Sequence, residues 1–311
     1  MALTLLESAK LALNNGETKR AGVIAMFAEM SAWLRAMNFI NIQGNSYAYS
    51  QEATLPGVAF RGVNESYTGS EGIVNPLAEA LRIAGGDLDV DKFIVDTMGM
   101  GVRAQHESMK VKALAAEITR VMIKGDSESN PREFDGLQKR CVNNQLIANG
   151  STSGGDPLSL AKLDELIAAV PGCNVLFVNR ALLLIRFTAA MRTSAVAGNI
   201  MQSRDDFGKP LLSYNGIPLL PAYPDNDGTD PLAFSEAGPG GGTTSSSIYA
   251  ARVGDGYYSM IQNGVMRVTD LGELQTQPLL RTRVEWYPGQ VVEHGRAVAR
   301  LWGISNAAIT A

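Results

Sequence analysis

Apolar and polar residues alternate over residues 45–72, NSYAYSQEATLPGVAFRGVNESYTGSEG. Tyr47 and Tyr49 share one face of an extended chain, and Val58 and Phe60 share another, on either side of a Leu-Pro-Gly break. Alternation that flanks a Pro-Gly break predicts two strands joined by a turn. Two strands alone are only marginally stable in water. This ribbon is therefore expected to pack against another surface.

Two segments before the ribbon have helical spacing. Residues 4–13 and 17–37 place apolar residues three and four positions apart, and the first segment ends at an Asn-Asn-Gly sequence. Together they form an N-terminal arm, residues 1–44, that is apolar on one side. Because no compact domain surrounds it in the sequence, the arm is expected to dock on another surface.

The longest helical pattern covers residues 102–124 and stops before Gly125. At 1.5 Å per residue, it predicts a rod of roughly 35 Å. Polar residues fill most of its surface, and Glu117 and Arg120 are close enough to pair. The apolar stripe that forms the candidate core of this helix consists of Val111, Leu114, Ile118, Val121 and Met122.

The remaining pattern predicts an α+β protein. Short strand-like runs lie between residues 73 and 96, the last of them Phe93-Ile94-Val95, and a loop-rich stretch over 125–157 marks a domain boundary. The elements expected beyond it are a helix over 160–170, a strand over 174–178, a helix over 180–191, a hairpin at Asn215-Gly216, a meander over 247–268, and strands over 280–286 and 297–302 separated by a turn at Pro288-Gly289.

Composition and charge exclude several classes of function. Hydrophobic residues make up 45% of the 311 residues, which allows a substantial core, and only 19% are charged. The net charge is −4 and no Lys/Arg run occurs, so tight binding to nucleic acid is not expected. The two cysteines, Cys141 and Cys173, form neither a disulfide framework nor a metal-ligand spacing. No stretch is long and apolar enough to span a membrane.

The search for catalytic or cofactor chemistry yields no site. The two histidines, His106 and His294, are isolated, and a glycine-flanked Ser-Thr-Ser at residues 150–154 places threonine where a hydrolase would need its nucleophile. An acidic loop resembles part of a calcium-binding loop, but it lacks the spacing and the final glutamate; its carboxylates are Asp225, Asp227 and Asp230. Neither a cofactor nor a metal is expected.

Element order and local phrases together resemble one family. LPGVAFRGVNESY followed by GIVNPLAEALRIAGGDLDVDKFIVD is similar to an extended ribbon and the sheet after it, and MKVKALAAEITRVMIKGD followed by FDGLQKR is similar to a spine helix. FGKPLLSYNGIPLLPA is similar to a hairpin segment. These phrases resemble the major capsid proteins of tailed bacteriophages, which have the Hong Kong 97 fold.

The resemblance implies a division into domains. The arm at 1–44 would lead to an extended loop at 45–72, and a peripheral domain would combine 73–145 with 271–311 and carry the spine helix at 102–124. An axial domain would cover 146–270 and point toward the five-fold and six-fold centres. The final strand would return to the first sheet.

The resemblance also implies a role for the ribbon and a set of partners. Pentamers and hexamers of the chain would close an icosahedral shell around packaged DNA, which the shell contacts weakly and without sequence preference. A separate scaffolding protein, a portal and a decoration protein are the further partners implied. The ribbon would lie across the neighbouring subunit, with contacts from Tyr47, Tyr49, Leu55, Val58, Phe60, Arg61 and Tyr67.

One departure and two alternatives qualify this interpretation. The family's type member cross-links its shell covalently through a lysine on the extended loop. Residues 45–72 contain no lysine, so that cross-link is expected to be absent. An encapsulin, a bacterial compartment of the same fold that holds an enzyme cargo, is the structural alternative. An α/β hydrolase with an unrecognised site is the alternative from another class.

Overall fold

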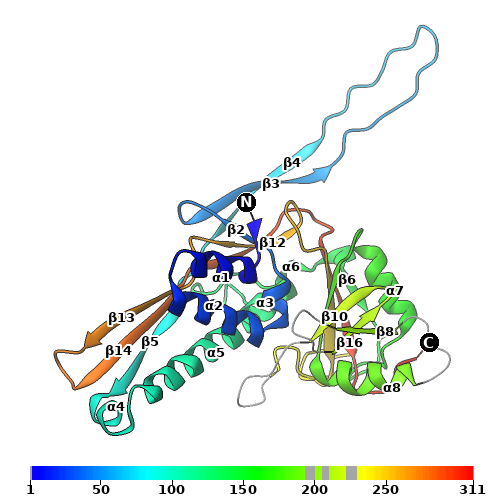
Figure 1. The fold of residues 1–311 in the computed structure, drawn as a ribbon. Helices are drawn as coiled ribbons and strands as arrows, with labels where there is room; N and C mark the ends of the chain where they lie inside the picture. Colours follow the sequence, from blue (N-terminus) through cyan, green and yellow to red (C-terminus); the bar gives the residue numbers. More distant parts are fainter. Residues whose placement is uncertain (1, 193–199, 205–209, 222–229, 311) are drawn as a thin grey trace.

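The chain is elongated, and its two ends carry different structures. The computed structural model describes residues 2–192, 200–204, 210–221 and 230–310. A two-stranded ribbon extends from one end of the body, and a three-stranded sheet with a short helix forms the other end (Figure 1). A seven-stranded sheet with its covering helices lies beside the body (Figure 1).

The helices are α1 (Leu5–Asn14), α2 (Thr18–Met30), α3 (Ala32–Ala36), α4 (Lys92–Met98), α5 (Gly101–Lys124), α6 (Leu137–Arg140), the 3₁₀-helix η1 (Asn143–Gln145), α7 (Leu160–Ala169), the π-helix η2 (Leu182–Phe187) and α8 (Thr188–Met191). The strands of the four-stranded sheet, in spatial order, are β1 (Ala2–Leu3), β2 (Phe39–Asn41), β12 (Tyr258–Gln262) and β15 (Pro288–Val292). The three-stranded sheet contains β13 (Arg267–Glu273), β14 (Leu279–Trp286) and β5 (Ala84–Asp91), and the ribbon contains β3 (Ser46–Thr54) and β4 (Ile73–Ala80). The seven-stranded sheet runs β6 (Leu146–Ala148), β16 (Val298–Ile304), β11 (Ser246–Ala251), β7 (Val175–Val178), β10 (Ile217–Pro221), β9 (Pro210–Tyr214) and β8 (Ile200–Arg204).

The seven-stranded sheet separates two hydrophobic cores. Along β7, Val175 and Phe177 belong to the larger core, whereas Leu176 and Val178 belong to the smaller one. Successive side chains of a strand point to opposite faces, so a strand buried on both sides reads as a continuous apolar run. The smaller core lies under α7 and η2, and the larger core continues to α5 and the N-terminal helices.

The long helix matches its sequence prediction to within one residue at its N-terminus. Val111, Ile118, Val121 and Met122 are all buried, and Leu114 is half-buried against the same core. Gly125 is the C-cap of the helix. No larger residue fits at this position, because a Cβ there would lie 2.2 Å from the carbonyl oxygen of Phe134 in the returning chain.

The N-terminal arm docks on its own chain. Thr4 and Glu7 form a capping box at the start of α1. Helix α1 packs on α2, and α2 packs along α5 (Figure 1). Trp33 is fully buried, its indole N–H donates to the carbonyl of Leu220 at 2.8 Å, and its ring centroid lies 5.0 Å from that of Phe177. The arm thus joins the long helix to the seven-stranded sheet, and it needs no other molecule as a surface.

Several local predictions were wrong. Phe93-Ile94-Val95 lies in helix α4, because Asp91 accepts from the Phe93 N–H at 2.8 Å and caps a helix there. The expected meander over 247–268 does not exist, since β11, β12 and β13 belong to three different sheets. Pro288-Gly289 begins strand β15.

The final strand also differs from its prediction. It pairs with β11 and β6 in the seven-stranded sheet, where it lies beside strands expected in the axial domain. The helix expected over 180–191 is present, but its first part, η2, has π-helical geometry.

Ile118→Asp should lower the free energy of unfolding by about 3–5 kcal/mol, since it buries a charge with no partner. Ile118 is 3% exposed in the larger core. Urea unfolding followed by circular dichroism measures this change. Ala113→Asp, at an exposed position of the same helix, is the matched control. Equal unfolding midpoints for the two variants would contradict the burial of this helix face.

Candidate assembly interface

The ribbon is an antiparallel pair whose second strand lies further along the chain than the sequence predicted. Strand β3 pairs with β4 from Ser46↔Ala80 to Thr54↔Ile73, with an irregularity between Glu52 and Thr54. The predicted turn at Leu55 to Gly57 and the predicted strand over Val58 to Phe60 were wrong. Both fall in a long loop, residues 55–72, that makes no ladder. Pro76 lies within β4. Proline is tolerated there because each strand of a two-stranded ribbon has an open outer edge, so the missing N–H removes no hydrogen bond to a third strand.

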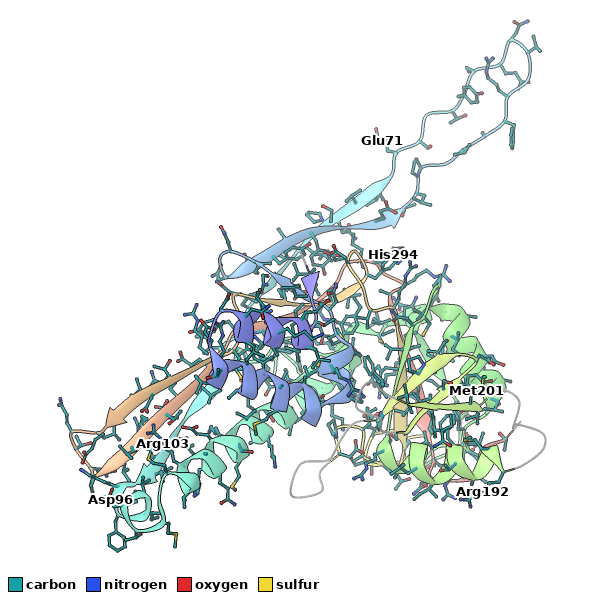
Figure 2. All side chains as sticks on the ribbon, viewed as in Figure 1. Glu71, Asp96, Arg103, Arg192, Met201 and His294 are labelled. Carbon is teal, nitrogen blue, oxygen red and sulfur yellow. The ribbon has the colours of Figure 1, made fainter. Side chains whose placement is uncertain are left out.

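The base of the ribbon is fixed to the body by Tyr47. Its hydroxyl donates to Oε1 of Glu293 at 2.6 Å, and Glu293 lies in the loop between β15 and β16. This hydrogen bond, together with partial burial, raises the pKa of Tyr47 to about 12, because losing the proton would set a phenolate beside a carboxylate. His294, the next residue, marks this seat at the foot of the ribbon (Figure 2).

A second attachment joins the other strand to the body. Glu79 accepts from Nη1 of Arg140 at 2.7 Å. The same guanidinium donates to the carbonyl of Asp135 at 2.9 Å and to that of Gln290 at 3.3 Å. The Arg140 side chain is only 13% exposed. A buried cation with several acceptors resists displacement, since removing one partner leaves a desolvated charge.

Beyond the ladder, the loop is ordered by a few contacts of its own. The Glu65 N–H donates to the Gly62 carbonyl at 3.4 Å, and the Glu65 carboxylate accepts from the Gly62 N–H at 2.7 Å. Asn64, at the third position of this turn, has φ 69°, and asparagine tolerates that conformation better than most residues. Ser70 donates to the Gly57 carbonyl at 2.8 Å and ties the two sides of the loop together.

The large side chains of this loop have no cover within the described chain. Arg61 lies 5.2 Å from the centroid of the Tyr67 ring, on the loop itself. Loop side chains this exposed contribute nothing to the core. The exposed fractions are Leu55 74%, Val58 93%, Phe60 104%, Val63 91% and Tyr67 66%.

The predicted site residues therefore fall into two groups. Leu55, Val58, Phe60, Arg61 and Tyr67 are free to contact another molecule, and their role in such a contact remains a prediction. Tyr47 and Tyr49 instead lie at the base; their rings stack at 6.2 Å, and the Tyr49 hydroxyl donates to Glu79 at 3.5 Å.

Sequence reasoning missed the groups that hold the base. Glu79, Arg140 and Glu293 make the attachments, yet Glu293 is 246 positions from Tyr47 and Arg140 is 61 positions from Glu79. No local pattern connects residues at such separations. Val63, which is apolar and almost fully exposed, lies out of phase with the alternation of Val58 and Phe60, so that pattern could not identify it.

The structure places the residues considered for other chemistry in ordinary structural contacts. The Thr152 hydroxyl donates to Asp156 at 2.6 Å within a turn, and Nδ1 of His294 accepts from the Arg296 N–H at 3.1 Å. Asp230 accepts from the Leu232 N–H at 2.9 Å; Asp225 and Asp227 lie outside the described residues. Within the described part of the chain, no cluster of three or more acidic, histidine or cysteine side chains could hold a metal, and none of the helices could cross a membrane.

Comparisons with known proteins identify the fold. Neither protein-family models nor curated proteins match the sequence. Among solved structures, an encapsulin from Synechococcus elongatus has a TM-score of 0.64 at 17% identity and covers 90% of each chain. A protein of Mycobacterium phage Bobi has a TM-score of 0.61 at 14% identity, over 89% of this chain and 91% of that one.

The capsid of a native GTA particle has a TM-score of 0.59 at 16% identity, and it covers 86% of this chain and 88% of its own. These likenesses extend over nearly the whole chain. They show that the chain has the Hong Kong 97-type capsid fold that the sequence resemblance implies.

Tyr47→Phe should loosen the base of the ribbon without unfolding the body. Loss of the hydrogen bond to Glu293 should raise deuterium uptake in β3 and β4 several-fold, because those strands have no other sheet neighbour. Hydrogen–deuterium exchange with mass spectrometry measures this uptake. Tyr67→Phe, in the exposed loop, is the control. Unchanged deuterium uptake in Tyr47→Phe would show that the attachment of the ribbon base does not depend on this hydrogen bond.

The ionisation of Tyr47 provides an independent check. Its folded pKa of about 12 lies above the ordinary value of 10.0, so its contribution to stability is complete below pH 10 and is lost as the pH rises through 12. Subtracting the absorbance titration of Tyr47→Phe from that of the native chain should reveal one phenol that ionises near pH 12. A difference curve centred at pH 10 would contradict the hydrogen bond.

Proposed function

We propose that this chain, which has the Hong Kong 97-type capsid fold, is the major capsid protein of a tailed double-stranded DNA bacteriophage. Copies of it would form pentamers and hexamers and close an icosahedral shell around the genome. One observation carries the proposal: a ribbon with a fixed base holds its exposed apolar loop away from the body, where only another molecule can cover it.

The ribbon would act as the link between neighbouring copies. Fully burying an aliphatic or aromatic side chain contributes about 1.5–3 kcal/mol, and the loop offers Leu55, Val58, Phe60 and Val63. Because the base is fixed by Tyr47 and Glu79, docking does not have to order the whole ribbon. Apolar burial would replace the lysine cross-link, since residues 45–72 contain no lysine.

The domain division carries over with one change. The peripheral domain would contain the spine helix α5 and the three-stranded sheet, and the axial domain would contain the seven-stranded sheet. Strand β16 belongs with the axial sheet by its pairing, so only the earlier part of 271–311 would belong to the peripheral domain.

The remaining partners follow from the resemblance and the charge. A separate scaffolding protein, a portal and a decoration protein would complete the particle, which would be assembled in the host cytoplasm. A net charge of −4 favours weak, sequence-independent contact with packaged DNA, because strong attraction to the phosphates would oppose packaging.

An encapsulin-like compartment is the second candidate. It is favoured by the encapsulin match, whose TM-score of 0.64 covers 90% of both chains. The two candidates share the shell and differ in what it encloses. A hydrolase gains no support from these neighbours, which are shell-forming proteins.

The contents of the particle decide between the two shells. The chain should be expressed with its genomic neighbours, and particles should be imaged by electron microscopy. Nuclease-protected DNA inside the particles is the result expected for the phage capsid. A single co-purifying enzyme and no DNA would identify a compartment, and a compact monomer that forms no particle would refute both.

Replacing residues 55–72 by Asn-Gly should abolish shells and leave the subunit folded. Thr54 and Ile73 are paired across the ribbon, and Asn-Gly closes a tight hairpin between paired strands. The melting temperature should stay close to that of the native chain, because the deleted loop buries nothing in the body. Size-exclusion chromatography and electron microscopy measure assembly.

Asn64→Gly, which keeps the backbone turn of the loop, is the matched control and should assemble normally. Particles of native size formed by the shortened chain would show that the loop is not an assembly element.

A further inference from the structure

The C-terminal end of α5 is the place where the ribbon, the long helix and the seven-stranded sheet are joined. Residues 125–136 form a loop that turns back onto the end of the helix, where the Gly136 N–H donates to the Gly125 carbonyl at 2.8 Å. A Cβ at Gly136 would lie 2.4 Å from the carbonyl oxygen of Ile123. Because the loop is packed this closely, it is expected to move together with the helix end.

Asp135 joins this loop to the ribbon. Its backbone carbonyl accepts from Nε of Arg140 at 2.9 Å, and the same guanidinium holds Glu79 of the ribbon. Its carboxylate accepts from the Ser127 N–H at 2.8 Å and lies 3.2 Å from Nζ of Lys139. Partial burial alone would raise the pKa of Asp135, but the bonds from Ser127 and Lys139 outweigh it and hold the pKa below its usual value. One residue therefore contacts the ribbon anchor through its backbone and the loop through its side chain.

Lys124, the last residue of α5, joins the helix to the seven-stranded sheet. Its Nζ lies 3.6 Å from Oε1 of Glu236, whose side chain is only 4% exposed. The other oxygen of this carboxylate accepts from Arg300 of β16 at 3.0 Å and from the hydroxyl of Ser247 of β11. Oε1 has no hydrogen bond to the described residues, so the Lys124 ammonium offsets the charge on that side. A buried carboxylate that loses such a partner is strongly destabilised.

We propose that Asp135 and Lys124 couple the attachment of the ribbon to the attachment of the seven-stranded sheet. A shift of the sheet relative to α5 would move Glu236 away from Lys124, and the end of the helix would have to follow or lose the contact. The loop would follow the helix end, and with it the Asp135 carbonyl that holds Arg140. Coupling between two sites is reciprocal, so loosening either attachment should loosen the other.

The value of this coupling for assembly rests on the proposed function. A subunit that serves in both pentamers and hexamers would have to change the direction of its ribbon and the tilt of its seven-stranded sheet. Coupling would make the two changes occur together, so that a ribbon docked on one neighbour favours the matching position of the sheet. The coupling itself lies within one chain and goes beyond that function, so it can be tested without particles.

Lys124→Met should loosen the ribbon from a distance. Hydrogen–deuterium exchange with mass spectrometry of the full chain should show about threefold faster uptake in β3 and β4. Among the described residues, Lys124 has no polar contact with the ribbon, so a purely local role would leave this uptake unchanged. Lys162→Met is the matched control, because it removes a lysine from an ion pair with Glu165 at 2.6 Å in helix α7.

The reciprocal variant is Glu79→Gln, which weakens the ribbon anchor. Uptake in β11 and β16, the strands that hold Glu236, should rise by about twofold. Glu52→Gln, at an exposed position of the same ribbon, is the control. Equal uptake of the two strands in Glu79→Gln and Glu52→Gln would contradict the reciprocity.

Combining the two substitutions separates coupling from two independent effects. Substitutions at sites with no shared partner usually have additive free energies. The variant with both Lys124→Met and Glu79→Gln should instead increase ribbon uptake by about threefold less than the product of the two single increases, because both interrupt the same chain of contacts. Either an increase equal to that product, or ribbon uptake in Lys124→Met no higher than in Lys162→Met, would overturn the proposal.

Asp135→Asn tests the link in case Lys124→Met does not fold. The Asp135 side chain is 30% exposed, and the variant keeps the backbone carbonyl that accepts from Arg140 while it removes the charge beside Lys139. Ribbon uptake should rise by about threefold with a native circular dichroism spectrum, and unchanged uptake would overturn the proposal. A native chain that forms no particles would instead refute the proposed function and leave the coupling standing.

Discussion

The rest of the architecture depends on the exposure of apolar side chains that the chain cannot bury by itself. Phe60 and Val58 lie almost wholly in water, although a soluble monomer rarely gathers such residues on one projecting segment. The backbone around them is nonetheless ordered, through the Gly62–Glu65 turn and the Ser70 bond to Gly57. A loop ordered without burial would already have its shape before docking on the proposed partner, which would lower the entropy lost on docking.

A projecting ribbon is useful only if the body behind it is rigid, and the body is held together by contacts between distant segments. Trp33 links the arm to the seven-stranded sheet. Arg103 of α5, buried, binds Asp270 at 2.6 Å and Thr282 at 2.8 Å and so fixes the long helix to the three-stranded sheet. Arg300 of β16 pairs with Glu236 at 3.0 Å in the same way. Forces applied at the ribbon or at helix α4 are therefore transmitted through one packed unit.

The sequence predicts those parts of the fold whose signal is local and strongly periodic. The stripe from Val111 to Met122 identifies the long helix because one face of its C-terminal half is buried in the larger core. The Asn215-Gly216 hairpin is equally local, since Asn215 adopts φ 49° as that turn requires. The Phe93 segment was misassigned because three consecutive apolar residues fit a strand and a helix equally well, and the Asp91 cap decided between them.

What the sequence could not supply is long-range pairing. Alternation around Val58 is real, but a strand needs a partner, and the partner of β3 begins only at Ile73. Likewise, the residues around Tyr47 do not predict its hydrogen bond to Glu293. The residues around β16 do not predict that it pairs with β11 rather than with the sheet of β12. Such choices are made by tertiary packing, which a periodicity argument does not contain.

Polar and apolar contacts occupy different parts of the molecule. Ion pairs that are wholly or partly buried lie inside the chain, at Arg103, Arg140 and Arg300, where they fix the relative positions of its elements. Large apolar groups are exposed at the two ends, among them Phe60 and Phe93, where a monomer would normally place charges. Buried charge pairs contribute orientation more than stability, whereas apolar burial is non-directional and tolerates small changes of angle. The chain therefore combines a rigid interior with exposed apolar ends, a combination that the proposed shell subunit would need at positions of different curvature.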